Sequence, residues 1–219
     1  MTMTGAAPQQ KYQVRFDVGL AGFRALADAA DVVILADALP SAGSEPVLPT
    51  PLRDHQVIAA SLADRENVAD WVLARQAEKG DRFSVAVIAV GERRHGGGAR
   101  FAVEDFLAAG AVIDALAARG IDHCSPEAAA AAAGFAGLQQ AVRHLVTASE
   151  TAQALVAAGR AAEVRAALRL DAPVTPAPAT QAPATQAPAT QARATDARAT
   201  DASTPSPGIS RLREFAFPA

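Results

Sequence analysis

Two apolar runs rich in β-branched residues constrain this chain more than any other feature. They are DVVILADAL, from Asp31 to Leu39, and FSVAVIAVG, from Phe83 to Gly91. Each has the continuous apolar character of a strand that is buried on both faces, as the strands of parallel sheets are. Parallel strands need long crossover connections, and helical patterns lie between and after these runs. The sequence therefore predicts an α/β protein with a mainly parallel sheet and flanking helices.

The other expected elements continue this alternation. Residues 12–30 read as a strand and a short helix, and another strand ends near Ser61. Helices are expected from about Asp64 to Lys79, with Gly80 at the C-cap position, and from about Phe101 to Arg119. An alanine-rich helical region follows and extends to Leu170. It begins with Ser125 at an N-cap and Pro126 at the first helical position, which together favour helix initiation.

We divide the chain into four parts. Residues 1–11 are expected to be flexible, and residues 12–174 to form one α/β domain. Residues 175–208 carry the pentapeptide APATQ and then ARATD in tandem, a tract with almost nothing to bury against its ordering entropy, so a disordered linker is predicted. Residues 209–219 regain apolar character, and their docking back on the domain would make the repeat an enlarged loop.

Charge and composition exclude several classes of function. The formal net charge is −3, and nothing supplies the basic face that a nucleic-acid backbone requires. No apolar stretch approaches the roughly 18 to 20 residues of a membrane span, and the first residues lack the features of a secretory signal. Cys124 is the only cysteine, which suits a reducing compartment. We expect a cytoplasmic protein without a nucleic-acid or membrane partner.

The loop GERRHGGGAR, which follows the second apolar run, is a candidate site by its position. Ligands of parallel α/β sheets bind beyond the carboxyl ends of the strands, and this loop begins at such an end. A glycine run would let the backbone approach a phosphate closely, and arginines can pair with its oxygens. The loop contains no Walker sequence or dinucleotide fingerprint, so neither kind of nucleotide binding is predicted. The candidate phosphate-binding residues are Arg93, Gly96, Gly97, Gly98 and Arg100.

Three acidic residues have two interpretations each. Glu104 and Asp105 open a helix, where the helix dipole alone favours acids, but carboxylates beside a phosphate loop are also typical Mg²⁺ ligands. Neighbouring helical residues point about 100° apart, so the two need not reach one ion by the same route. Asp37 ends a buried strand, where it forms either a plain turn or a catalytic strand-end acid.

Several segments resemble the 2-phosphosulfolactate phosphatase family, and the similarity covers most of Tyr12 to Asp171. The family is α/β and Mg²⁺-dependent, and it hydrolyses the phosphate ester of a small sulfonated hydroxy acid. The resemblance therefore implies a phosphomonoesterase that acts on a small phosphorylated acid. The segments that carry it are YQVRFDVGLAGFRAL, VVILADAL, SLADRENVADWV, VAVIAVGER, RFAVEDFLAAGAVIDAL and LVAAGRAAEVRAALRLD.

The resemblance also implies roles for individual residues. Asp37 matches the family's strand-end aspartate, Glu104 and Asp105 match its Glu-Asp pair, and the sequence from Gly91 to Arg93 matches its Gly-Glu-Arg. The implied catalytic residues are Asp37 and Glu92. The implied Mg²⁺ ligands are Asp37, Glu104 and Asp105.

The same segments are compatible with a second function. Only about a dozen residues separate Leu39 from Leu52, where the family has a long segment. TPLRD lacks the family's Asn-Gly turn, and TAQAL stands where the family has Ser-Gly-Arg-Glu-Leu. A phosphate site needs its donors together and pre-positioned. The alternative is therefore a catalytically inactive, shortened relative that binds an anion or forms homo-oligomers.

Overall fold

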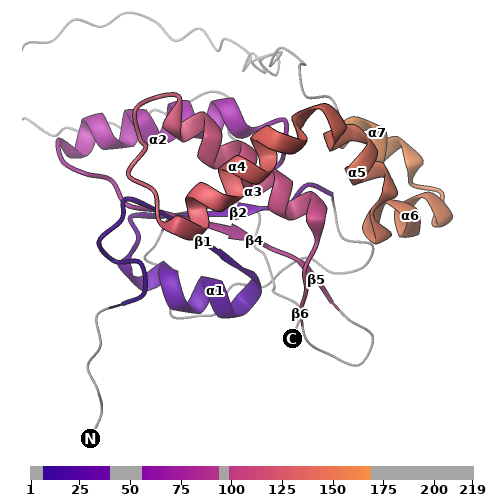
Figure 1. Cartoon of the computed structure of the whole chain (residues 1–219), viewed down its shortest axis with the longest axis horizontal. Coiled ribbons are helices and arrows are strands. Elements are labelled where there is room, and N and C mark those ends of the chain that lie inside the picture. The colour runs from indigo at the N-terminus through magenta and orange to yellow at the C-terminus, as the bar shows by residue number, and fades with distance from the viewer. Residues whose placement is uncertain (1–6, 40–55, 94–98, 169–219) are drawn as a thin grey trace, which may run out of the picture.

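A four-stranded parallel sheet forms the centre of the molecule (Figure 1). The computed structural model describes residues 7–39, 56–93 and 99–168 of the chain. The strands are β1 (Val14–Val18), β2 (Val32–Ala36), β3 (Gln56–Ala60) and β4 (Val85–Ala89), and their order in the sheet is β1-β4-β2-β3. The two apolar runs became β2 and β4, which are the central strands and are buried along their whole length. The predicted fold class is confirmed.

Helices cover both faces of the sheet. Helix α1 (Gly19–Leu26) and a short 3₁₀ turn, η1 (Ala27–Ala29), pack on one face. Helices α2 (Arg65–Lys79), α3 (Val103–Ala117) and α4 (Pro126–Leu138) lie on the other face, where the larger hydrophobic core is (Figure 1). The result is a three-layer α/β arrangement.

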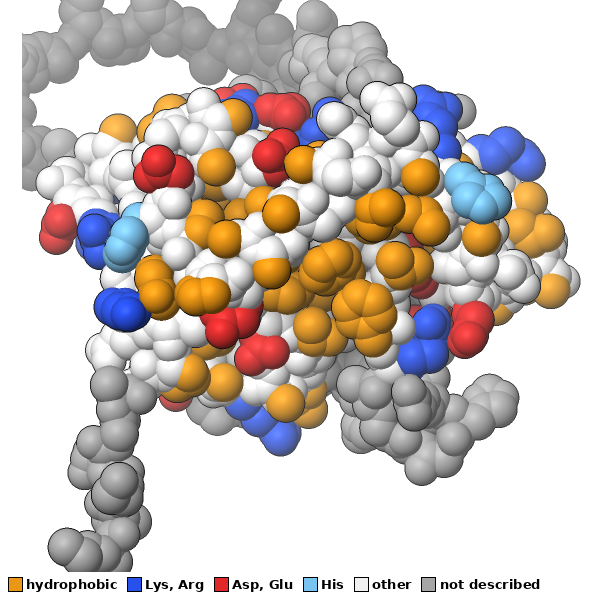
Figure 2. Space-filling view, viewed as in Figure 1, with side chains coloured by type: hydrophobic (Ala, Val, Ile, Leu, Met, Phe, Trp, Pro, Cys, Tyr) orange, Lys and Arg blue, Asp and Glu red, His pale blue; other side chains and the backbone are white. Residues whose placement is uncertain are grey.

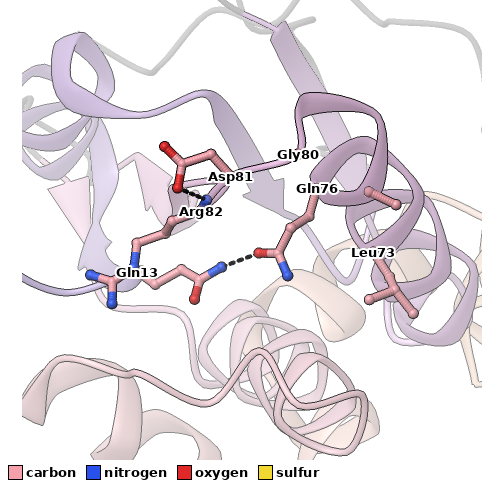
Figure 3. A pocket seen from close by; sticks show the side chains of 7 residues that line it. Gln13, Leu73, Gln76, Gly80, Asp81 and Arg82 are labelled. Atoms are coloured by element: carbon pink, nitrogen blue, oxygen red, sulfur yellow. Dashed lines mark hydrogen bonds between the residues drawn. The ribbon is translucent and has the colours of Figure 1, made fainter.

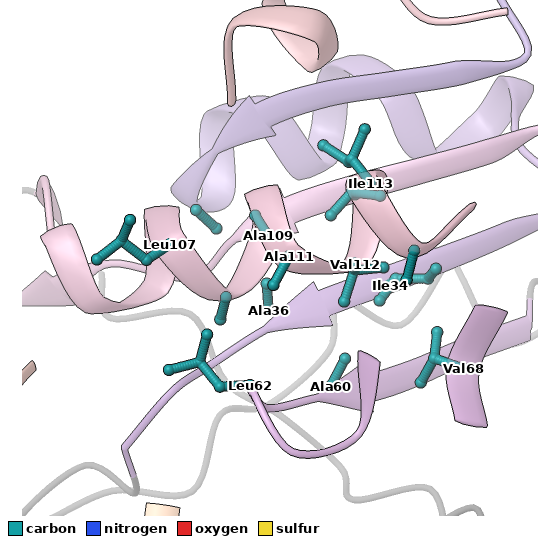
Figure 4. Packing of buried hydrophobic residues seen from close by; sticks show 14 of the residues in the cluster. Ile34, Ala36, Ala60, Leu62, Val68, Leu107, Ala109, Ala111, Val112 and Ile113 are labelled. Atoms are coloured by element: carbon teal, nitrogen blue, oxygen red, sulfur yellow. The ribbon is translucent and has the colours of Figure 1, made fainter. Parts of the chain in front are cut away.

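Helix α3 is the centre of the larger core. Its apolar residues from Leu107 to Ile113 face side chains of β2 and β3 and the start of α2 (Figure 4). Small residues bring α3 and α4 very close together, because a Cβ at Gly110 would lie 2.3 Å from the carbonyl oxygen of Ala131. This close approach explains why both helices are rich in alanine and glycine.

The predicted helix ends have the expected geometry. The Ser125 Oγ accepts the N–H of Ala128 at 3.1 Å at the start of α4. Gly80 ends α2 with φ +68, in the left-handed region that glycine adopts without strain. At the outer edge of β1, the Gln9 side chain binds both backbone groups of Phe16, at 3.0 and 3.1 Å, and so occupies part of that edge.

The remaining elements lie near the carboxyl ends of the strands. The loop after β4 contains a short antiparallel pair, β5 (Glu92–Arg93) and β6 (Ala99–Arg100), where the sequence predicts only a loop. A 3₁₀ turn, η3 (Gln139–Ala141), precedes α5 (Val142–Ala148), α6 (Glu150–Ala157) and α7 (Ala161–Ala167), which lie beyond the start of α3 (Figure 1).

Two further predictions concern membrane spans and the division of the chain into parts. None of the helices in the described ranges is long and apolar enough to cross a membrane. The division into four parts stays a prediction, and residues 175–208 and 209–219 lie outside the described residues.

Candidate active site

The candidate site lies at the carboxyl ends of β2 and β4. The neighbouring strands β1 and β4 lead into helices on opposite faces of the sheet, α1 and α3. Connections that diverge in this way leave a crevice at the strand ends, which is where α/β proteins bind ligands. Three of the predicted acids converge here: Asp37 directly follows β2, and Glu104 and Asp105 lie in the first turn of α3.

Asp105 connects the ends of the two central strands. Its Oδ1 accepts the N–H of Ala38 at 2.9 Å, and its Oδ2 accepts the N–H of Gly91 at 2.9 Å. The side chain is buried, with 4% of the residue exposed. Burial and the charge of Asp37 raise the pKa of Asp105 well above its usual value, although the two hydrogen bonds oppose this rise. Asp105 therefore holds the strand ends at a fixed separation.

The side chain of Glu104 contacts the start of α6. It is 1% exposed, and its Oε1 accepts a hydrogen bond from the hydroxyl of Thr151. Its Oε2 is also buried, yet it has no hydrogen-bond partner within the described ranges. An unsatisfied oxygen on a buried carboxylate is costly, and such atoms in native structures often mark a bound ion or a catalytic role.

Asp37 is half-buried at the end of β2. Its N–H donates to the carbonyl of Ala60 at 3.0 Å, which continues the parallel ladder, and its Oδ1 accepts the N–H of Leu39 at 3.2 Å. Asp105 accepts the N–H of Ala38, the next residue along the chain, so Asp37 lies close to Asp105, and its charge raises the pKa of Asp105. The structure therefore brings Asp37 and Asp105 together, and their roles as catalytic or metal-binding residues stay predictions.

Arg100 and Glu92 face each other across the β5–β6 pair. Arg100 Nη2 donates to Glu92 Oε2 at 2.9 Å, and its Nε lies 3.3 Å from Glu150 Oε2, at the start of α6. Burial lowers the pKa of Arg100, but Glu92, Glu150 and Glu104 outweigh it, and the net shift is upward. The predicted catalytic glutamate and the predicted phosphate-binding arginine thus contact each other.

The other predicted phosphate-binding residues are less fully described. Arg93 forms β5 and its backbone pairs with Ala99, but the structure does not describe its side chain. The three glycines of the loop, Gly96, Gly97 and Gly98, lie outside the described residues. Their assignment to phosphate binding stays a prediction, as do the roles of the other site residues.

The acidic side chains around Arg100 bear on whether a metal ion could bind here. Glu92, Glu150 and Glu104 all raise the pKa of Arg100, so the surroundings of this arginine are acidic. The described residues contain no group of three or more His, Cys, Asp or Glu arranged to hold a metal ion. The donor atom that fits such an ion best is Oε2 of Glu104, whereas both oxygens of Asp105 accept backbone N–H groups.

Two residues that contact the site were not predicted from the sequence. Thr151 and Glu150 come from the first turn of α6, and they contact Glu104 and Arg100 respectively. The sequence marks this stretch only as TAQAL, the place where the family's motif is altered. Its position over Glu104 depends on how α6 packs, which no local pattern encodes.

A groove lies at the opposite ends of the strands, away from these acids. It is an open groove of about 480 Å³ between the end of α2 and the amino ends of β1 and β4 (Figure 3). Gln13 donates to Gln76 across it, and Arg82 and Asp81 lie at its rim. The predicted catalytic and metal-binding acids do not line this groove, so the carboxyl ends of the strands remain the better candidate site.

The chain matches the family model described as 2-phosphosulpholactate phosphatase over residues 49–175, which is 127 of 219 residues. The matched range contains Glu92, Arg100, Glu104, Asp105 and Thr151, and it begins after Asp37. No curated protein matches the chain.

Proposed function

The chain belongs to the 2-phosphosulpholactate phosphatase family, and from this premise we propose that it hydrolyses the phosphate ester of a small acidic molecule, such as 2-phosphosulfolactate, with Mg²⁺. Membership of this family makes it a phosphatase, that is, a phosphoric monoester hydrolase. The substrate and the identity of the metal are the proposed parts. We place the activity in the cytoplasm, because the single cysteine suits a reducing compartment.

One observation carries this proposal. The buried, unpartnered Oε2 of Glu104 lies in a cluster of carboxylates at the carboxyl ends of the central strands. A fold gains nothing from leaving a charged oxygen unsatisfied in its interior, so the arrangement favours a ligand that completes it. A hard cation that prefers oxygen ligands is the simplest such ligand.

The proposed metal ligands are Glu104 and Asp37. When bound, a divalent cation offsets the charge of the phosphoryl oxygens. Asp105 keeps the ends of β2 and β4 in place through its bonds to Ala38 and Gly91, and so positions Asp37 and Glu92. Its own role as a metal ligand, which the resemblance implies, remains a proposal of lower rank because each of its oxygens already accepts a backbone N–H.

The proposed chemistry uses two further residues. Arg100 supplies guanidinium donors for the phosphoryl oxygens, in exchange for part of its pairing with Glu150. Glu92, released from Arg100 by the substrate, accepts the proton of the attacking water. The water oxygen forms a new bond to phosphorus as the ester P–O bond breaks, and the departing oxygen takes up the proton that Glu92 accepted, so that the products are the alcohol and inorganic phosphate. Direct attack by the Asp37 carboxylate is the other route that the resemblance allows.

The experiment is a measurement of phosphate release from 2-phosphosulfolactate and from 2-phospholactate. The purified full-length protein is first treated with a chelator and then titrated with Mg²⁺. We expect release that requires the metal and that is faster for the substrate whose acidic group fits the site. Absence of release from either ester at any Mg²⁺ concentration would contradict the proposal for these substrates.

The inactive, shortened relative is the second candidate. Its anion-binding form is disfavoured by the carboxylates around Arg100. Its oligomer-forming form is favoured by exposed apolar residues on the face where hydrophobic side chains gather over α4 and the start of α3 (Figure 2). Phe101 is 54% exposed and its ring centre lies 5.5 Å from that of Phe106. A monomer at all concentrations in sedimentation equilibrium would exclude the oligomer-forming candidate.

A further inference from the structure

We propose that Thr151 is a positioning residue for the phosphatase reaction. Its hydroxyl fixes one oxygen of Glu104 and thereby leaves the other oxygen available to the site. The inference rests on the proposed function, and it adds a role for the C-terminal helices. It concerns a residue that does not itself touch the reacting atoms.

The contact has a defined direction. The hydroxyl of Thr151 is the donor, and Oε1 of Glu104 is the acceptor. Both residues are buried, with Thr151 3% and Glu104 1% exposed. Hydrogen bonds to an ionised group in a buried position are short and strong, and they fix the geometry of the acceptor. The carboxylate of Glu104 therefore cannot rotate freely between its two oxygens.

The start of α6 is itself well anchored. The Ser149 Oγ accepts the N–H of Ala152 at 3.2 Å, which caps the helix. Glu150 reaches Arg100 from the same turn, with 3.3 Å between its Oε2 and the Arg100 Nε. The first turn of α6 thus touches the site at two points, once through the hydroxyl of Thr151 and once through the carboxylate of Glu150.

The asymmetry of the Glu104 carboxylate is the feature that points to function. A purely structural glutamate would have both oxygens satisfied, as both oxygens of Asp105 are. Glu104 instead has one oxygen held by Thr151 and one buried oxygen without a partner in the described ranges. The hydroxyl selects which oxygen remains for the ligand, and this is how an outer partner orients a residue that binds an ion or substrate.

The test compares Thr151→Val with Thr151→Ser. Valine fills nearly the same space without a hydroxyl, whereas serine keeps the hydroxyl. The matched control is Thr147→Val on α5, where the exposed hydroxyl bonds only to backbone carbonyls. The measurements are kcat and KM for phosphate release, the Mg²⁺ concentration that gives half-maximal rate, and the rise in melting temperature that Mg²⁺ alone produces.

The expected result is a loss of about 10- to 100-fold in kcat/KM or in Mg²⁺ affinity for Thr151→Val. Thr151→Ser should recover most of that loss, and Thr147→Val should match the wild type. Circular dichroism would show whether Thr151→Val is folded. If it is not, the activity and Mg²⁺ affinity of Thr151→Ser, which keeps the side-chain donor, decide instead. Wild-type activity in both Thr151→Ser and Thr151→Val would overturn the inference.

The outcome also separates this inference from the proposed function. A wild type that releases phosphate with Mg²⁺ while Thr151→Val does so equally well refutes the positioning role and leaves the phosphatase intact. A wild type that neither releases phosphate nor gains thermal stability from Mg²⁺ refutes the proposed function, and the positioning role falls with it.

Discussion

Oδ2 of Asp105 accepts the backbone N–H of Gly91 at 2.9 Å, and this bond ties the first turn of α3 to the end of β4. The partner bond from Ala38 ties the same carboxylate to the end of β2. One side chain thus sets the relative position of the segments that carry Asp37, Glu92 and Glu104. The geometry of the site therefore depends on a buried acid that accepts two backbone N–H groups.

Asp105→Asn should therefore weaken the fold as well as the site. An amide offers one acceptor oxygen, so one of the two backbone N–H groups would face the amide NH₂ and lose its partner. We expect the free energy of unfolding to fall by about 1–3 kcal/mol, measured by urea denaturation. Asp114→Asn, which changes an exposed acid on the same helix, is the control and should have little effect. Equal stability of the two variants would show that Asp105 does not connect the strands.

Gly91→Ala should disturb the connection between β4 and β5. Gly91 has φ +74, and a Cβ there would lie 2.8 Å from the carbonyl oxygen of Arg100. The backbone strain alone costs about 1–2 kcal/mol, and the contact adds to it. Gly137→Ala is the matched control, since nothing lies within 4 Å of its Cβ position and alanine favours helix. We expect denaturation curves to show loss for the first variant and a slight gain for the second.

Asp31 provides a pH-dependent prediction far from the site. Burial raises the pKa of Asp31, but hydrogen bonds from Lys79 and Ser84 outweigh it and the net pKa is lowered below 3.8. A depressed pKa in the folded state stabilises the fold above the unfolded value, and this stabilisation is lost as the pH falls. The wild type should be more stable than Asp31→Asn at neutral pH, and the difference should shrink below pH 3.8. A difference that is constant with pH would contradict this.

Arg100→Gln tests the assignment of the phosphate contact. The amide removes the guanidinium charge that now pairs with Glu92 and Glu150. If Arg100 binds the phosphoryl group, kcat/KM for phosphate release should fall at least about tenfold at saturating Mg²⁺. Arg143→Gln, on an exposed position of α5, should leave the rate unchanged. An unchanged rate in Arg100→Gln would assign the phosphate contact to another group.

The sequence predicts the fold well because its signals are local. Continuous β-branched runs identify β2 and β4, while the serine at position 125 and the glycine at position 80 mark helix ends that the structure confirms. These features depend on a few neighbouring residues and on burial from both faces. They needed no knowledge of how the helices pack.

The site was less predictable because its contacts join distant segments. The sequence marks Glu104 and Asp105 as a pair, but the helix turns them to different partners, one to Thr151 and the other to the strand ends. Which acid would hold backbone N–H groups, and which would keep a free oxygen, follows from the packing of α3 and α6. The sequence also does not predict the antiparallel pair of β5 and β6, because strands of two residues are too short to show a pattern.

The most direct test of the account is the rate of phosphate release by Glu104→Gln at saturating Mg²⁺, with Glu127→Gln, an exposed glutamate of α4, measured in parallel. We predict that kcat/KM of Glu104→Gln falls at least about 100-fold while that of Glu127→Gln equals the wild type, with both variants folded by circular dichroism. A Glu104→Gln variant that hydrolyses the ester as fast as the wild type would contradict the assignment of the site to this carboxylate cluster.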